Sequence, residues 1–277
     1  MVTPHGFCFS IISEFIENSG ENLTKQNCEL KPFYRLAERL HARFPRLPIA
    51  LALTGQYAAG SVFDICSQHE WAFMVTLKDK DLPSVQQEFS ALRKLQPQNK
   101  LRRITLEKAE IIQDFLWVDD IDYRDSANRS HTLSVLQCTE STATKNGTPT
   151  ITTFKWVKNL RVTAANVVEL ASNGGRIRWK GENEGFNVQK NGGFGLEHAY
   201  SNNPTSAKAF YFLLQVAHVI DQLIHRGSLL NQIFPKGFGS GRNLAFRLLE
   251  AWRNASLSIE FFTALAVSHL QIRFDSS

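Results

Sequence analysis

The segment 176–201, RIRWKGENEGFNVQKNGGFGLEHAYS, combines cations, carboxylates and aromatic rings more densely than the rest of the sequence. It places the cations Arg176, Arg178, Lys180 and Lys190 around the rings of Trp179 and Phe186, with Glu182 and Glu184 between them. If the segment is helical, Arg178, Glu182 and Phe186 share one face at i, i+4 spacing. A carboxylate set among cations suits a divalent metal ion that also meets phosphate oxygens. The other interpretation is an i,i+4 salt bridge between Arg178 and Glu182 on an exposed helix, and Gly181 and Gly185 weaken a helix here.

A second stretch, LALTGQYAAG (51–60), ends an apolar run at Thr54-Gly55. The run IALAL (49–53) predicts a short buried strand, and the carboxyl end of such a strand is where an α/β sheet usually presents its chemistry. Thr54 stands at that end with a hydroxyl, and no carboxylate accompanies it there.

The stretch RIRWKGENEGFNVQKN resembles the signature of the IS4-like DDE transposases, which is Arg-x-x-x-Glu with a Trp after the Arg and a Lys beyond the Glu. The matching residues here are Arg178, Trp179, Glu182 and Lys190. The stretches LALTGQYAAG and FMVTLKDKDLP are similar to segments of one subgroup, and the similarity covers most of residues 1–225. Two departures are Gly181, where the subgroup has an aliphatic residue, and Gly175, where the family has a Tyr.

The resemblance implies an RNase H-like core in which three carboxylates hold two Mg²⁺ or Mn²⁺ ions for DNA strand cleavage and transfer. It implies that Glu182 is a catalytic metal ligand and that Thr54 replaces the second catalytic Asp. The first Asp of the family lies on an earlier strand, which we expect to be missing with an N-terminal portion. The DNA-binding residues that it implies are Arg176, Arg178, Trp179, Lys180 and Lys190.

Because a neutral hydroxyl cannot neutralise a bound dication, we interpret the chain as a transposase-derived protein that is catalytically inactive and does not bind the metal tightly. The alternative is a non-catalytic module that binds DNA or partners a transposase. A third interpretation is a metal nuclease with unconventional ligands. The partners that these interpretations imply are DNA, a second copy of the chain or a full-length transposase.

The elements that must position these residues begin with an alternation of strands and helices. Strands are predicted at 6–18, 49–53 and 71–78, and helices at 28–44, 60–70 and 83–95. Such alternation implies a mainly parallel sheet covered by helices.

The middle of the chain departs from this alternation. Residues 101 to about 160 predict an antiparallel β-insertion with a hairpin turn at Asn146-Gly147, and helices follow at 163–175, 207–224 and 242–255. The expected fold is an α/β, RNase H-like mixed sheet with flanking helices, interrupted by the insertion. The expected divisions are 1–100 for the first part of the core, 101–162 for the insertion, 163–225 for the part carrying Glu182, and 226–277 for a helical tail.

Composition limits the class of protein. The chain has 277 residues, a formal net charge of +5 and a pI near 9.0, which weakly favours an anionic partner. Its apolar runs at 209–220 and 261–272 are too short to span a bilayer, so core helices are expected and no membrane. The N-terminus lacks a secretory pattern, which favours a cytoplasmic location.

Other motifs predict little chemistry. The four cysteines are far apart and lack CxxC spacing, so free thiols are expected. The basic run 93–108 suits either a phosphate backbone or a solvated face. The Gly-rich GFGSGR (237–242) lacks the features of a P-loop and predicts a linker, and Glu197-His198 is a candidate for a supporting pair beside the signature.

Overall fold

A computed structural model describes residues 1–3, 6–16, 25–106, 111–142, 149–198, 200–227, 239–256, 258–260 and 263. The chain divides into two compact units, Met1–Val188 and Gln189–Ser277. This boundary lies within the region 163–225 that the sequence predicts as one part of the core.

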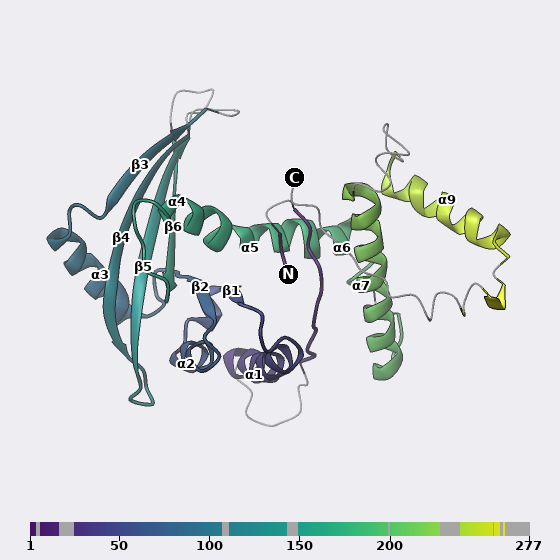
Figure 1. Ribbon diagram of the computed structural model, residues 1–277, viewed down its shortest axis with the longest axis horizontal. Helices are drawn as coiled ribbons and strands as arrows, with labels where there is room; N and C mark the ends of the chain where they lie inside the picture. The colour runs from purple at the N-terminus through teal and green to yellow at the C-terminus, as the bar shows by residue number, and fades with distance from the viewer. Residues whose placement is uncertain are drawn as a thin grey trace. The chain divides into compact units, whose positions relative to one another are not determined.

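The first unit contains a six-stranded sheet (Figure 1). Its strands are β1 (Ala50–Leu53), β2 (Ala72–Thr76), β3 (Lys100–Thr105), β4 (Ile111–Arg124), β5 (Ser130–Thr142) and β6 (Thr150–Lys158), in the order β1-β2-β6-β5-β4-β3. The predicted mixed α/β fold with flanking helices is confirmed. The expectation of a mainly parallel sheet is wrong, because only β1 and β2 pair in parallel and the other four pairings are antiparallel. The predicted β-insertion continues the sheet, since β6 pairs directly with β2.

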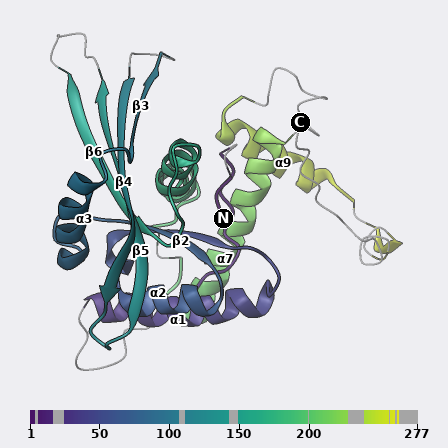
Figure 2. The same ribbon diagram turned by 60° about the vertical axis from the view of Figure 1, so that its left-hand side comes forward.

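Helices cover both faces of this sheet. The strands β3 to β6 form an antiparallel β-meander. The helices that precede it are α1 (Lys25–Arg43), α2 (Gly60–Gln68) and α3 (Pro83–Leu95), close to the predicted ranges. A longer helical run follows β6 and begins against the face opposite to α3 (Figures 1 and 2). It consists of α4 (Val167–Glu169), η2 (Leu170–Gly175), α5 (Ile177–Lys180), η3 (Gly181–Asn187) and α6 (Val188–Asn191).

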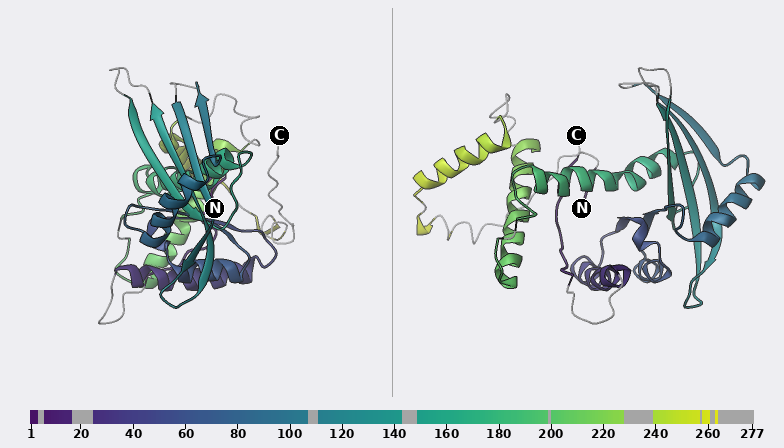
Figure 3. Two further views of the ribbon diagram at one scale, coloured as in Figure 1. Left: turned by 90° about the vertical axis from the view of Figure 1, so that its left-hand side faces the viewer. Right: turned by 180° about the vertical axis from the view of Figure 1, so that it is seen from behind.

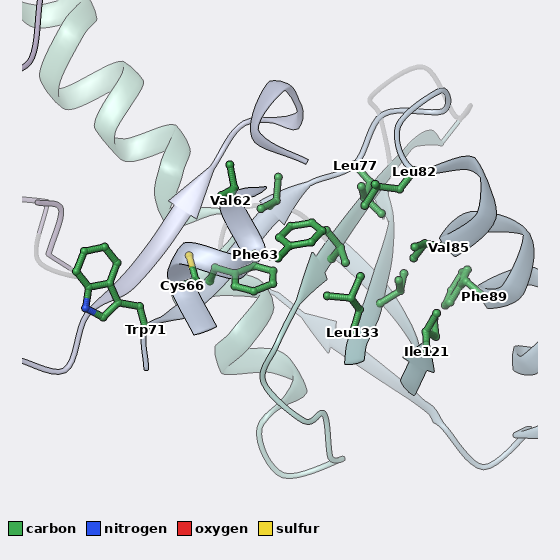
Figure 4. Packing of buried hydrophobic residues seen from close by; sticks show 14 of the residues in the cluster. Val62, Phe63, Cys66, Trp71, Leu77, Leu82, Val85, Phe89, Ile121 and Leu133 are labelled. Carbon is green, nitrogen blue, oxygen red and sulfur yellow. The ribbon is translucent and has the colours of Figure 1, made fainter. Parts of the chain in front are cut away.

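Strand alternation divides the core into two layers. On β5, Leu133 and Val135 face the layer that α1, α2 and α3 cover, while Leu136 and Cys138 face the helical run. Figure 4 shows the first layer, in which Phe63 of α2 and Phe89 of α3 pack near strand residues such as Leu133. The sheet is therefore apolar on both faces, as expected for a sheet buried between helices.

A β-bulge in β4 places Asp119 near the buried Lys158 at the end of β6. The register with β5 shifts between Val118 and Ile121, and the displaced Asp119 accepts a hydrogen bond from the amide of Val162 at 2.9 Å. Lys158, at the end of β6, is fully buried, and its ammonium donates to the carbonyl of Leu160. Burial lowers the pKa of Lys158 to about 8, although the charge of Asp119 acts in the opposite direction.

The N-terminal residues do not form the strand predicted at 6–18. Residues 6–16 contain no strand, only an isolated antiparallel bridge between Val2 and Cys8, and residues 17–18 lie outside the described part. Cys8 lies against η3, where a Cβ added to Gly185 would be 2.6 Å from the Cys8 sulfur. Small residues in η3 thus leave room for the N-terminal segment.

The second unit contains α7 (Pro204–Arg226) and α9 (Gly241–Asn254), which Figure 3 shows as separate helices. The predicted helices at 207–224 and 242–255 are confirmed. The run 209–220, expected to be a core helix, is helical but only partly buried: Leu214 and His218 are buried, whereas Phe210, Leu213, Val216 and Ile220 are exposed. The run 261–272 lies almost wholly outside the described residues. No helix in the described ranges is long and apolar enough to cross a membrane.

Candidate functional site

Thr54 lies at the carboxyl end of β1, as predicted. Leu53 pairs with Val75 of β2, and Thr54 stays extended before the 3-10 turn η1 (Gly55–Tyr57). The Thr54 hydroxyl oxygen is buried and has no hydrogen-bond partner. A buried hydroxyl without a partner is uncommon in folded proteins, which makes this strand end a candidate for a lost or altered site.

Asp81 is the carboxylate beside this strand end. A Cβ added to Gly55 would lie 2.4 Å from the Asp81 Oδ2 atom and 3.1 Å from the carbonyl oxygen of Thr76. Asp81 Oδ2 accepts a hydrogen bond from the amide of Lys78 at 2.8 Å, which holds the loop after β2. Asp81 follows Thr54 by 27 residues in the sequence. Its placement follows from the parallel pairing, because the ends of two parallel strands meet at one sheet edge.

The helical run 167–191 starts on the sheet. Val167 and Ala171 pack in the second core layer with Trp156. Gly175 follows at the closest approach, where an added Cβ would lie 2.3 Å from the Trp156 ring. A residue larger than Gly at position 175 would collide with this ring. Beyond Gly175, α5 lies against β1, so the turn preceding Glu182 runs beside the strand that ends at Thr54.

Two stretches of this run, η2 and η3, are π-helical. Both are Gly-rich, LASNGG and GENEGFN, and the second contains Glu182. π-helical turns are rare and occur frequently at functional sites, because their wider backbone redirects side chains. The predicted helical i, i+4 relation between Arg178 and Glu182 survives at the start of η3.

Glu182 forms the predicted ion pair with Arg178. The Arg178 Nη1 atom is 3.0 Å from the Glu182 Oε2 atom, and the Glu182 side chain is 52% exposed. The Arg178 guanidinium also lies 5.6 Å from the centroid of the Trp179 ring. Among the described residues, the Thr54 hydroxyl oxygen has no hydrogen-bond partner, so it makes no hydrogen bond to the Glu182 carboxylate.

Carboxylates compensate most of the predicted DNA-binding cations. Arg176 pairs with Glu140 of β5 and lies 4.9 Å from the Phe154 ring centroid, so it fixes the helical run to the sheet. In the second unit, Lys190 Nζ lies 2.6 Å from the Glu197 Oε1 atom. Of the candidate supporting pair Glu197-His198, Glu197 thus forms an ion pair with a residue of the predicted signature.

Trp179 and Lys180 remain at the surface. Trp179 is 50% exposed and Lys180 is also exposed. An exposed indole beside a guanidinium is a surface on which a nucleic-acid base or sugar can stack. These two residues are therefore the part of the predicted DNA-binding set best placed to meet a ligand.

The basic run 93–108 is partly described. Arg102 forms a two-pronged pair with Asp114 across β3 and β4, with Nε 2.6 Å from Oδ1 and Nη2 2.9 Å from Oδ2. Arg103 is exposed on the same strand, and residues 107–108 lie outside the described part. The solvated-face interpretation therefore applies at least to Arg102.

These donors do not fit a two-metal centre. The resemblance implies three carboxylates, whereas this strand end offers the Thr54 hydroxyl and the Asp81 carboxylate, which already accepts a hydrogen bond from the Lys78 amide. The Glu182 carboxylate is already compensated by Arg178. Within the described ranges no group of three His, Cys, Asp or Glu side chains could hold a metal ion. These residues therefore do not support chemistry by Mg²⁺ or Mn²⁺ at this strand end, and the absence of tight metal binding stays a prediction.

Comparison with models of protein families finds no match, and comparison with curated proteins finds none either.

Proposed function

We propose that this chain is a transposase-derived protein that binds DNA without cutting it. The proposal rests on the contact between the helix that carries the transposase-like motif and a strand that ends at an uncharged residue. The helix α5, which carries Arg178 and Trp179 and precedes Glu182, lies against β1, and β1 is followed by Thr54, whose hydroxyl has no hydrogen-bond partner among the described residues.

The order of elements supports an RNase H-like origin. A parallel pair, β1 and β2, is followed by an antiparallel meander, and the segment with Glu182 comes after that meander. This is the order that the resemblance to IS4-like DDE transposases implies. The proposal about ancestry thus rests on sequence motifs and element order together.

The chemistry at the strand end argues against cleavage by this chain. Two metal ions need several carboxylate oxygens to offset their charge, and Thr54 supplies none. Glu182 is held by Arg178 at 3.0 Å, so its charge is already balanced in the protein. A catalytic carboxylate of a metal nuclease would have to be released from this ion pair.

The surface of α5 supports DNA binding of modest strength. Trp179 can stack and Lys180 can contact a phosphate, while Arg176 and Arg178 are occupied by Glu140 and Glu182. Because such binding rests on contacts to the phosphate backbone, we expect it to weaken as salt rises and to depend little on sequence.

The experiment measures duplex binding by fluorescence anisotropy at about 50 mM and about 200 mM salt. We expect Trp179→Ala to weaken binding by about tenfold, in line with the loss of one stacking contact. The matched control is Trp252→Ala, which removes an exposed indole from α9 in the other unit and should leave binding unchanged. Absence of binding at low salt, or equal effects of the two substitutions, would count against this DNA surface.

Cleavage is tested separately with Mg²⁺ or Mn²⁺ and labelled duplex. We expect no cleavage by the wild-type chain. Metal-dependent cleavage that disappears in Glu182→Gln would overturn the proposal and favour the unconventional nuclease.

A further inference from the structure

Three arginines follow one another at four-residue intervals on α1, namely Arg35, Arg39 and Arg43. Residues four apart lie on the same side of a helix, so the three form a basic stripe along α1. The first two share one carboxylate of the N-terminal segment. Arg35 Nε lies 2.8 Å from Glu14 Oε1, and Arg39 Nη1 lies 2.6 Å from Glu14 Oε2. One carboxylate therefore serves two of the three cations.

Arg43 is the cation of the stripe that has no carboxylate. Within the described ranges its side chain makes no ion pair and no hydrogen bond. The N-terminal segment that supplies Glu14 to Arg39 also reaches the end of the helix, where it presents Ile11 and Ile12. Neither of these two side chains can pair with a guanidinium. The ion pairing along α1 thus stops one arginine short.

A cavity of about 620 Å³ lies at this end of α1. Cavities of roughly 300 to 1,000 Å³ hold small-molecule ligands, and they usually combine apolar walls with a few polar groups that fix the ligand's orientation. This cavity has both, because four apolar side chains and two guanidinium groups line it. All of them belong to the first unit, so its walls do not depend on where the second unit lies. The lining residues are Ile11, Ile12, Arg39, Ala42, Arg43 and Phe44.

The charges beside the cavity favour an anion. Three guanidinium groups against one carboxylate leave two positive charges along the stripe. A guanidinium can hold a carboxylate through two parallel N–H donors, and Glu14 shows that a carboxylate is the group to which this stripe already binds. The carbonyl end of a helix disfavours an anion, so attraction has to come from Arg43 and from the apolar walls.

We propose that this cavity binds a small amphipathic carboxylate, a molecule with one carboxylate and a hydrocarbon body. The carboxylate takes the place opposite Arg43 that a second glutamate of the N-terminal segment would fill. The hydrocarbon body lies against Ile11, Ile12 and Phe44. An ion without a hydrocarbon body would leave these walls in water, and an uncharged hydrocarbon would leave Arg43 unpaired. Both parts of the ligand are therefore needed.

Octanoate is the probe, because it joins one carboxylate to a flexible hydrocarbon chain. Isothermal titration calorimetry on the full chain should give one site, with a dissociation constant on the order of 0.1 to 1 mM for a ligand of about ten non-hydrogen atoms. Acetate and octanol each lack one part of the ligand and should bind at least about tenfold more weakly. Absence of saturable octanoate binding up to about 10 mM, or acetate binding as tight as that of octanoate, overturns the proposal.

Two substitutions locate the site. Arg43→Gln should weaken octanoate binding at least about tenfold, because it removes the charged donor. The matched control is Arg46→Gln, which removes the same charge from an exposed residue just beyond α1 and should leave binding unchanged. Ile11→Glu supplies the missing carboxylate and should abolish binding. Circular dichroism shows whether each variant keeps its helices. Octanoate binding that neither Arg43→Gln nor Ile11→Glu changes overturns the proposal.

Duplex DNA is the other anion that a basic stripe could meet. We expect saturating duplex to leave octanoate binding unchanged. Displacement of octanoate by duplex, together with weaker duplex binding in Arg43→Gln, would overturn the small-molecule site and assign the stripe to the DNA surface. Failure of octanoate to bind does not affect the proposed DNA binding, which rests on α5.

Discussion

Replacing Lys158 by Met should change how the stability of the first unit depends on pH. Lys158 ends β6, pairs in register with Met74 and Ser134, and has no exposed surface. Burial lowers the pKa of its ammonium to about 8, from an unfolded value near 10.4. Met has a similar length and no charge, so Lys158→Met removes the titrating group while keeping most of the packing.

The size of the effect follows from the two pKa values. A difference of about 2.5 units corresponds to about 3 kcal/mol, by which the protonated form destabilises the folded state. In the interval from about pH 8 to about pH 10.4, the unfolded chain holds a proton that the folded chain has lost, so stability rises with pH. Below about pH 8, the buried charge of Lys158 destabilises the folded state by the full amount. Between about pH 7 and about pH 10, wild type should therefore gain about 2 to 3 kcal/mol relative to Lys158→Met.

The assay is denaturant unfolding of both proteins at the two pH values, followed by tryptophan fluorescence. Trp71, Trp117 and Trp156 are all buried in the first unit, so the signal reports the sheet. At about pH 7 the variant should be the more stable protein by about 1 to 2 kcal/mol, because loss of the hydrogen bond to Leu160 offsets part of the gain.

The pH difference is the decisive measurement. Other titrating groups contribute equally to both proteins and cancel. A constant stability difference between the two proteins from neutral to alkaline pH would refute the reasoning, since it would mean that Lys158 titrates alike in the folded and unfolded chains.

Three further predictions concern single side chains of the first unit. Thr54→Val should stabilise the chain by about 1 kcal/mol in thermal unfolding, because it removes a buried hydroxyl that has no partner, and a loss of stability would point to an interaction of that hydroxyl. Gly175→Ala should destabilise by about 1 to 3 kcal/mol, since its Cβ would lie 2.3 Å from the Trp156 ring, and an unchanged melting temperature would contradict the close packing. Burial acts to raise the pKa of Asp125, but hydrogen bonds from the Arg129 backbone and guanidinium and from His131 lower it to about 2. Its stabilising contribution should be complete above about pH 4 and disappear as the pH falls towards 2, so the stability gap between wild type and Asp125→Asn in acid denaturation should close over that range.

Local patterns predicted the elements but not their assembly. The ranges of α3, β1 and β2 follow from apolar spacing and from Pro83 at the start of the helix. The direction of the sheet could not be read in the same way, because β6 takes the place beside β2 that a further parallel strand would otherwise fill. The position of β6 beside β2 depends on contacts between residues that are distant in sequence.

In the candidate site, too, contacts between sequence neighbours were predictable and contacts between distant residues were not. The spacing of Arg178 and Glu182 predicted their ion pair, which forms at 3.0 Å. The role of Arg176 was not predictable, because its partner Glu140 is on a strand 36 residues away in sequence. The exposure of Val216 was also missed, since an apolar run does not indicate which face of a helix is buried and a polar network on the other face decides it.

The junction between β2 and β6 has a consequence for how the sheet opens. Only three residue pairs, from Met74–Lys158 to Thr76–Trp156, join the β1–β2 pair to the meander, whereas β4 and β5 share twelve. The meander is built from neighbouring antiparallel strands, while the junction closes a loop that contains all of β3, β4 and β5, at a larger entropic cost. Native-state hydrogen exchange should therefore be faster for amides of β1 and β2 than for those of β4 and β5. The strand that ends at Thr54 would then belong to the part of the sheet that detaches first and folds last.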